Sequence, residues 1–267
     1  MRNSRTLARL RNGEPVRICS LGHFIPSYVA HAARHGYDCI WLDLEHNAIS
    51  TEEFRSLMPH FHMHDIDCMV RPKTRDRTSL YRYLEDGATG LLIPHVSTPE
   101  LAQELVDAVK FPPLGDRGIC GANLDSDYLG HPLSDYIEHA IQETFLVVQL
   151  ETPTAIENAE KIASTPGVDG LFVGPGDLGI RVAHDATAMS VEAAIAHVAE
   201  IAAKTNKAWG LPVTADSIRT RRDQGAQLLA HGNDFLAMLQ MLEQWSGEFT
   251  NALSPANNGT AKPAQQV

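Results

Sequence analysis

The sequence lacks any segment typical of membrane insertion or export. No run of about 18 apolar residues, the length needed to span a bilayer, occurs along the 267 residues. The N-terminus, MRNSRTLARLRNGEP, contains no apolar stretch of the kind found in a secretory leader. We therefore expect a soluble, cytoplasmic protein.

Basic residues are scarce. The chain has 22 Lys and Arg against 33 Asp and Glu, which gives a formal charge of −11. Because nucleic acids and anionic membranes are bound by basic surfaces, neither is an expected partner. A small anionic substrate is still compatible with this charge, since a few local donors suffice to bind it.

Two further motifs are missing. The four cysteines form no CxxC pair, and three of them lie in apolar runs, which favours reduced core thiols over disulfides. No GxGxxG follows the first apolar run, which disfavours a dinucleotide-binding fold. The cysteines are Cys19, Cys39, Cys68 and Cys120.

What is present is an alternation of short apolar runs and longer amphipathic stretches, which is typical of a parallel sheet with crossover helices. The runs are apolar on both faces, as expected for strands between a barrel interior and a layer of helices. We predict strands at 16–22, 39–44, 68–71, 90–96, 145–150, 170–174, 208–213 and 234–238. We predict helices at about 26–36, 50–64, 77–87, 98–109, 153–164, 190–205, 216–229 and 239–252.

Eight such units in a chain of this length predict a (β/α)8 barrel, formed as a single domain by residues 1–253. Residues 110–144 interrupt the pattern with a long insert that contains a predicted short helix around 133–143. Such an insert is either a functional lid or a surface elaboration. The polar tail, 254–267, is predicted to be disordered.

Charged or imidazole side chains stand at five successive predicted strand ends. Barrel enzymes carry their chemistry at the carboxyl ends of the strands, so these side chains should converge on one mouth. Each of them alone is equally well explained as a solvated loop charge. They are Asp43, Glu45 and His46, then Arg71, His95, Glu151 and Asp177.

Glu151 and Asp177 follow neighbouring strands, so their carboxylates can approach one point. Two oxygen ligands suit a hard cation such as Mg²⁺ or Mn²⁺, with water or substrate in the other positions. The alternative is two unrelated carboxylates, one of which caps a helix. The preceding turn, Gly174-Pro175-Gly176, lets backbone N–H groups approach an anion.

Two other residues suit proton transfer and charge stabilisation. His46 could act as a general acid or base, with Asp43 or Glu45 orienting its ring; otherwise it is a surface histidine. Arg71 is permanently charged, which suits an oxyanion; otherwise it forms a structural ion pair. A Schiff-base aldolase needs a desolvated lysine, but only Lys73 lies near a strand end, in a polar KTRDR run.

These residues resemble the HpcH/HpaI family of class II pyruvate aldolases, within the phosphoenolpyruvate-mutase-like barrels. The resemblance spans about residues 16–240, in order and with similar spacing. It is carried by the segments WLDLEH (41–46), VRP (70–72), GA (87–88), LIP (92–94), PPxGxRG (112–118), QxET (149–152) and VGPGDL (173–178).

The resemblance implies a role for each matching residue. Glu151 and Asp177 would hold a divalent metal, Mg²⁺ or Mn²⁺ with Co²⁺ as an alternative, and the metal would chelate a pyruvate unit. Arg71 would stabilise the enolate oxygen, and His46, paired with Asp43, would move the proton of the 4-hydroxyl. Gln149 would touch substrate or a water on the metal, and backbone N–H groups around Gly176 would hold the carboxylate. Family members also swap their last helix and assemble as hexamers, trimers of dimers, so a homo-oligomer is expected.

Several positions depart from the commoner aldolase pattern. The first strand ends in CSLGH where a Trp is expected, AMLQML follows the last predicted strand in place of Val-Gly-x-Asp, and Asp177 is followed by Leu-Gly-Ile-Arg181. His95, with Trp41 and Tyr136, resembles macrophomate synthase, a family member that decarboxylates oxaloacetate and adds the enolate to a second substrate.

Three functions follow for testing. The first is a metal-dependent aldolase that cleaves 4-hydroxy-2-oxo acids to pyruvate and an aldehyde. The second is an oxaloacetate decarboxylase or a carbon–carbon-forming synthase of the macrophomate-synthase or citrate-synthase-like type. The third is a catalytically silent barrel, which five retained strand-end residues disfavour.

Overall fold

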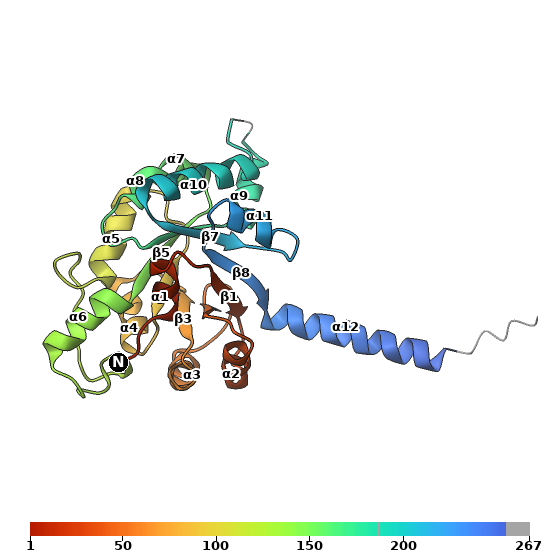
Figure 1. The fold of residues 1–267 in the computed structure, drawn as a ribbon, viewed down its shortest axis with the longest axis horizontal. Helices are drawn as coiled ribbons and strands as arrows, with labels where there is room; N and C mark the ends of the chain where they lie inside the picture. Colours follow the sequence, from red (N-terminus) through yellow and green to blue (C-terminus); the bar gives the residue numbers. More distant parts are fainter. Residues whose placement is uncertain (186, 255–267) are drawn as a thin grey trace, which may run out of the picture. The chain divides into compact units, whose positions relative to one another are not determined.

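The computed structural model describes residues 1–185 and 187–254, and its sheet closes into a barrel of eight parallel strands in chain order (Figure 1). The barrel closes where Val16 of the first strand pairs with Leu228 of the eighth. The strands are β1 (Val16–Leu21), β2 (Cys39–Asp43), β3 (Asp67–Arg71), β4 (Gly90–Ile93), β5 (Phe145–Leu150), β6 (Gly170–Val173), β7 (Ala208–Pro212) and β8 (Leu228–Asn233).

Helices surround this barrel, and at least one helix lies between each strand and the next along the chain (Figure 1). They are α1 (Arg5–Arg11), α2 (Pro26–Arg34), α3 (Thr51–Met63), α4 (Arg77–Glu85), α5 (Pro99–Val109), α6 (Leu133–Glu143), α7 (Pro153–Glu157), α8 (Ala159–Ala163), α9 (Pro175–Val182), α10 (Val191–Thr205) and α11 (Ile218–Asp223), with a 3-10 turn η1 (Leu124–Ser126). The predicted (β/α)8 fold is confirmed.

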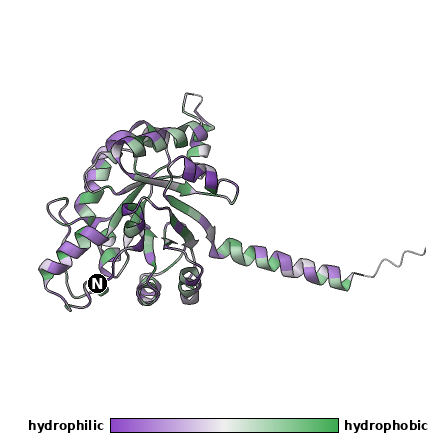
Figure 2. Cartoon of the chain, in the orientation of Figure 1, coloured by the Kyte–Doolittle hydropathy of each residue, from purple (hydrophilic) through white to green (hydrophobic). Residues whose placement is uncertain are grey.

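The strands form because their residues can be buried on both faces. β2 to β6 are buried at every position. One set of side chains packs outward against the helices, as Leu42 and Val70 do, and the other fills the barrel interior, as Met69 and Phe172 do. Figure 2 shows this concentration of hydrophobic residues on the barrel strands. The burial of two apolar layers is the main driving force for closing the sheet.

The helix starts follow the predicted capping signals. Ser50 forms a capping box with Glu53 at the start of α3. Thr98 and Thr152 cap α5 and α7, each followed by a proline at the first helical position. These caps satisfy backbone N–H groups that a helix leaves without an internal partner.

The prediction of the last strand is wrong. Residues 234–238 belong to a helix, and β8 is formed by LLAHGN, six residues earlier in the chain. The run DFLAM is apolar enough to resemble a strand, whereas β8 ends in His231-Gly232-Asn233 and therefore lacks an apolar second half. Consequently Asp234 directly follows the last strand, and the expectation that no Gly-x-Asp stands at the end of this strand is also wrong, because the sequence there is Gly232-Asn233-Asp234.

The structure contains two helices that the sequence pattern does not predict, α1 and α9, and two of the predicted helices have different bounds. α1 precedes the first strand, and α9 begins in the Gly-Pro-Gly turn. The predicted helix 153–164 is two helices, α7 and α8, and the predicted helix 216–229 is the shorter α11. The insert between α5 and β5 contains α6, at the predicted position 133–143.

The contacts divide the chain into a unit formed by Met1–Asp234 and a unit that begins at Phe235. The second contains most of α12 (Asp234–Leu253), along which hydrophobic and hydrophilic residues alternate (Figure 2). None of the helices in the described ranges is long and apolar enough to cross a membrane. The predicted disordered tail, 254–267, lies almost entirely outside the described residues, which end at Ser254.

Candidate active site

Arg71, the last residue of β3, is held at the rim of the barrel by a buried ion pair with its neighbour on the adjacent strand β2. Its Nε and Nη2 donate to the two carboxylate oxygens of Asp43, at the end of β2, each over 2.8 Å. The guanidinium also lies 4.6 Å from the ring centroid of Trp41, which belongs to β2 and packs in the barrel interior. This arrangement fixes the planar guanidinium, which is what stabilisation of a developing anion requires.

Glu45 connects three other groups of this mouth. Its carboxylate lies 3.2 Å from Arg71 Nε, and 3.6 Å from Nε2 of both His46 and His95. Asp43 is instead occupied by Arg71 and by the side-chain amide of Asn47, which donates to it over 2.9 Å. The implied pairing of His46 with Asp43 is therefore replaced here by a contact between His46 and Glu45.

His95, just after β4, contacts Glu151 through both its backbone and its ring. Its N–H donates to Glu151 Oε1 over 2.8 Å, and its Nδ1 lies 2.9 Å from the same oxygen. The His95 backbone adopts the left-handed region, with φ 57°, which is uncommon for a residue other than glycine. The turn thereby directs main chain and imidazole at one carboxylate oxygen.

Asp177, in the first turn of α9, shares its surroundings with Glu151. Burial raises the pKa of Glu151, the His95 N–H opposes this, and the nearby charge of Asp177 raises that pKa further. A hydrogen bond from Arg181, with Nη1 2.8 Å from Oδ1, lowers the pKa of Asp177. Arg181 Nη1 also donates to the backbone carbonyl oxygen of Glu151 over 3.4 Å, so one guanidinium contacts both residues.

Gly174 makes room for the side chains on the inner face of β5. A Cβ at this position would lie 2.6 Å from Glu151 Oε2 and 3.1 Å from Gln149 Nε2. Gln149 is 3% exposed, and its Oε1 is buried with no hydrogen-bond partner among the described residues. A buried acceptor without a donor costs free energy, so this oxygen marks a place where a bound group would donate.

The donors present suit an oxygen-ligated cation. Glu151 and Asp177 supply carboxylate oxygens, which are the ligands that hard divalent cations prefer. In the described part of the chain, no group of three or more His, Cys, Asp or Glu is arranged to hold a metal ion. A cation here would therefore have two protein carboxylates and open positions for substrate, which is a pattern of catalytic sites rather than structural ones.

Helix α9 begins in the turn before Asp177, and its first turn is partly exposed to solvent. Pro175 is the first residue of α9, and Gly176, which follows, is exposed with nothing within 4 Å of an added Cβ. The first N–H groups of a helix have no internal partner and favour anions. The Gly174-Pro175-Gly176 turn can therefore receive a carboxylate at its backbone.

Two residues at the same mouth were missed. Asp234 follows β8, and its carboxylate accepts hydrogen bonds from the N–H groups of Gly22 and His23, both over 3.1 Å. It also lies 2.6 Å from His23 Nδ1, just after β1. The Gly-x-Asp sequence after the apolar residues 228–230 was the signal that could have identified Asp234.

Tyr136 does not belong to this mouth. It is buried on α6, where it donates to Asp125 over 2.5 Å and accepts from Arg117 over 2.9 Å. Tyr136 therefore lies apart from His95 and Trp41, because the insert directs it into a separate buried cluster with Phe111.

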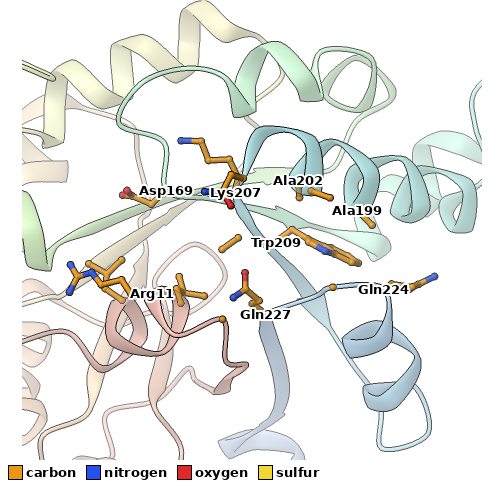
Figure 3. Close-up of a pocket in the computed structure, with 15 residues that line it drawn as sticks. Arg11, Asp169, Ala199, Ala202, Lys207, Trp209, Gln224 and Gln227 are labelled. Carbon is orange, nitrogen blue, oxygen red and sulfur yellow. The ribbon is translucent and has the colours of Figure 1, made fainter.

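A hollow of about 580 Å³ lies at the other end of the barrel (Figure 3). It is lined by residues that precede β6, β7 and β8, namely Asp169, Lys207 and Gln227, together with residues of α1 and α10. None of the predicted site residues lines it, so the candidate chemistry is confined to the carboxyl ends of the strands.

Comparison with known proteins identifies relatives along most of the chain. The family described as HpcH/HpaI aldolase/citrate lyase matches residues 21–240. A hydroxypyruvate/pyruvate aldolase from Sagittula stellata is 38% identical, over 66% of this chain and 68% of its own. One from Pseudomonas aeruginosa is 32% identical over 90% and 91%. A 2-keto-3-deoxy-L-rhamnonate aldolase from Klebsiella pneumoniae is 31% identical over 82% and 83%.

Solved structures share the fold. An HpcH/HpaI aldolase from Desulfitobacterium hafniense has a TM-score of 0.85 at 26% identity, covering 91% of this chain and 95% of its own. Macrophomate synthase has a TM-score of 0.78 at 22% identity, covering 94% and 90%, a likeness that concerns the fold alone.

Proposed function

The chain belongs to the HpcH/HpaI aldolase/citrate lyase family and is an aldolase, and we propose that it cleaves 4-hydroxy-2-oxo acids to pyruvate and an aldehyde with the aid of a divalent metal ion. The proposal is supported by one observation above all. Side chains from the ends of β2 to β4 are linked through Glu45 and His95 to Glu151, beside Asp177.

Glu151 and Asp177 would hold the metal, Mg²⁺, Mn²⁺ or Co²⁺, whose chemistry is to polarise the 2-oxo group as a Lewis acid. Gln149 Oε1, buried without a donor, would accept from a group on the substrate side. The backbone of the Gly174-Pro175-Gly176 turn would receive the carboxylate of the pyruvate unit.

Cleavage needs a proton removed and a negative charge stabilised. The 4-hydroxyl loses its proton, the C3–C4 bond breaks with its electron pair left on C3, and C4 departs as an aldehyde. His46, exposed at the mouth beside Glu45, takes that proton. Arg71, fixed by Asp43, stabilises the enolate oxygen until C3 takes up a proton from solvent to give pyruvate, and the protonated His46 returns its proton to solvent.

A cleavage assay tests this proposal. The protein is stripped with a chelator and supplied with Mg²⁺, Mn²⁺, Co²⁺ or none, and pyruvate released from 4-hydroxy-2-oxo acids is quantified by chromatography. We expect release only with metal, and at least about 10²-fold less with Arg71→Ala, the scale of losing one oxyanion donor. Release that is indifferent to chelation contradicts the role given to Glu151 and Asp177.

His95 favours a second candidate, decarboxylation of oxaloacetate with or without addition of the enolate to another acceptor. Its ring touches both Glu45 and Glu151, so it can reach the substrate beside them. Loss of CO2 also leaves an electron pair on C3, but it requires no proton transfer from a 4-hydroxyl. Oxaloacetate loss that is faster than any aldol cleavage, and abolished by His95→Ala, would establish this alternative.

We also propose that the chain self-associates through α12. This helix exposes large apolar side chains, a surface that monomeric proteins rarely leave uncovered. A second copy of the chain is the proposed occupant, as in the helix-swapped hexamers that the family resemblance implies. Sedimentation should show an oligomer that Leu239→Glu with Trp245→Glu dissociates. The exposed residues are Phe235, Leu236, Met238, Leu239, Met241, Leu242, Trp245, Phe249 and Leu253.

Cytoplasmic location and the absence of nucleic-acid and membrane partners stay predictions.

A further inference from the structure

A histidine and an aspartate stand together at the carboxyl ends of β1 and β8, in a pair that the proposed mechanism does not use. His23 Nδ1 lies 2.6 Å from Asp234 Oδ2. The two strands are neighbours, and Ser20 of β1 pairs with Asn233 of β8, so the residues that follow them leave the barrel side by side. A carboxylate beside an imidazole is the arrangement that orients a histidine for proton transfer.

Asp234 holds both the backbone and the ring of His23. Its carboxylate accepts from the N–H groups of Gly22 and His23, each over 3.1 Å, in addition to its contact with the ring. The Asp234 side chain is 4% exposed, whereas that of His23 is 53% exposed and so is accessible to solvent and to a substrate at the mouth. Because Nδ1 faces the carboxylate, a proton that the ring delivers leaves from Nε2.

A chain of contacts joins this pair to the arginine of the candidate site. The backbone of Gly22 packs against Asn47, since a Cβ at position 22 would lie 2.8 Å from Asn47 Oδ1. Asn47 donates to Asp43 over 2.9 Å, and Asp43 holds Arg71 through two bonds of 2.8 Å. His23 therefore follows directly on the residue that packs against the support of Arg71.

The proposed cleavage needs a second proton transfer, at a different atom from the first. His46 takes the proton of the 4-hydroxyl, and the electron pair left on C3 must then receive a proton that comes from solvent. Arg71 stabilises the enolate oxygen but does not lose its own proton at neutral pH. C3 is two bonds from that oxygen, so a proton carrier beside the support of Arg71 is well placed to serve it.

We propose that His23 carries the solvent proton to C3 of the enolate, with Asp234 as its positioning residue. This inference rests on the proposed aldolase function. In this step the electron pair of the enolate forms the C3–H bond and the Nε2–H bond of the imidazolium breaks. The neutral ring then takes a proton from solvent. In the reverse direction, the neutral ring removes a proton from C3 of a bound 2-oxo acid.

Hydrogen exchange at C3 of 2-oxobutanoate tests this role without any cleavage of a carbon–carbon bond. This acid has two hydrogens on C3, and one imidazole approaches the planar enolate from one face only. In D2O with Mg²⁺, wild type should exchange one of the two hydrogens in preference to the other, as read by NMR after stereospecific reduction of the 2-oxo group. His23→Gln should slow the exchange at least about 10²-fold and leave a residual exchange without preference. His31→Gln, the same change at an exposed histidine of α2, should alter neither the rate nor the preference.

Binding of oxamate separates proton transfer from a structural role. Oxamate resembles pyruvate but has an amide in place of C3, so its affinity does not depend on a C3 proton. Calorimetry should give the same affinity for wild type and His23→Gln. Loss of oxamate binding in parallel with exchange, exchange at the wild-type rate and preference in His23→Gln, or no exchange in wild type would each overturn the inference.

Cleavage assays then distinguish this inference from the proposed function. His46→Gln should lose cleavage of 4-hydroxy-2-oxo acids and keep the exchange, because the two histidines serve different atoms. Exchange that depends on His23 in a protein that cleaves none of these acids would support the role of His23 and contradict the aldolase proposal. Cleavage in a protein whose exchange is indifferent to His23→Gln would leave the aldolase proposal standing and overturn the inference.

Discussion

Arg71 and Asp43 form a two-bond ion pair between the ends of adjacent strands, with both donor–acceptor distances at 2.8 Å. Their side chains are only 10% and 12% exposed. The pair therefore links the stability of the barrel mouth to the orientation of the residue proposed to stabilise the enolate.

Asp43→Ala should destabilise the fold, because it removes both hydrogen bonds of the buried Arg71 guanidinium to Asp43 and leaves Glu45 as its remaining carboxylate partner among the described residues. Removal of one partner of a largely buried pair costs about 3 kcal/mol, measured as a lower free energy of unfolding in urea. Asp116→Ala breaks the more exposed pair with Arg77 and should cost no more than about 1 kcal/mol. Equal losses in the free energy of unfolding for the two variants would mean that the buried Arg71–Asp43 pair stabilises the fold no more than an exposed pair does.

His46→Ala should slow cleavage of 4-hydroxy-2-oxo acids by about 10²–10⁴-fold in kcat, the usual contribution of a general acid or base. Decarboxylation of oxaloacetate, which has no 4-hydroxyl proton to transfer, should be spared. Both rates are measured on the same preparation. A parallel loss of the two activities would assign His46 to binding or folding.

Arg181→Ser should tighten metal binding. Arg181 occupies one oxygen of Asp177 and places a positive charge beside the proposed cation position, so it opposes a second cation. We expect the Kd for Mn²⁺ to fall about tenfold, which is 1.4 kcal/mol, as followed by the electron paramagnetic resonance of the free ion. Arg34→Ser, an exposed arginine on α2, serves as the control. Weaker binding in Arg181→Ser would show that the arginine orients Asp177 for the metal.

Asp125 should make stability fall between about pH 4 and pH 7. Burial raises its pKa from 3.8 to about 6, against the opposing effects of Arg117 and of the Tyr136 hydroxyl. Because the folded protein holds this proton more tightly than the unfolded chain, the contribution is full below pH 4 and is lost as the pH rises through about 6.

The rise in pKa corresponds to on the order of 3 kcal/mol. Unfolding of wild type and Asp125→Asn across this range isolates it, since every other titrating group is common to both. The stability of wild type relative to Asp125→Asn should decline toward neutral pH. A difference in stability between wild type and Asp125→Asn that does not change with pH would mean that Asp125 is not the group that takes up the proton.

The sequence allowed the barrel to be predicted because five of its strands, β2 to β6, can be buried at every position, and because capping residues precede helices such as α3, α5 and α7. β8 escaped because its apolar part, residues 228–230, is short and the following helix begins with a longer apolar run. Because the last strand was predicted at 234–238, Asp234 was assigned to the strand and not to its end, so the contact of Asp234 with His23 was not predicted.

Which strand ends carry charged side chains could be predicted from position alone, but their partners could not. Asp43, Glu45 and His46 are close in sequence. Side-chain directions after the strand end decide that both acids contact Arg71 but that Glu45 is the one beside His46. The left-handed turn at His95 is similarly invisible in sequence, since it occurs at a residue that is not glycine.

The two glycines of the turn before Asp177 differ in how replaceable they are. At position 174 even a methyl group would overlap Glu151, because it would lie 2.6 Å from Oε2 and 2.9 Å from Cβ of that buried side chain. Position 176 faces open space, so alanine should be accommodated without displacing a neighbour. A saturation library should therefore show strict intolerance at the first glycine and permissiveness at the second, although the tetrapeptide presents them as equivalent.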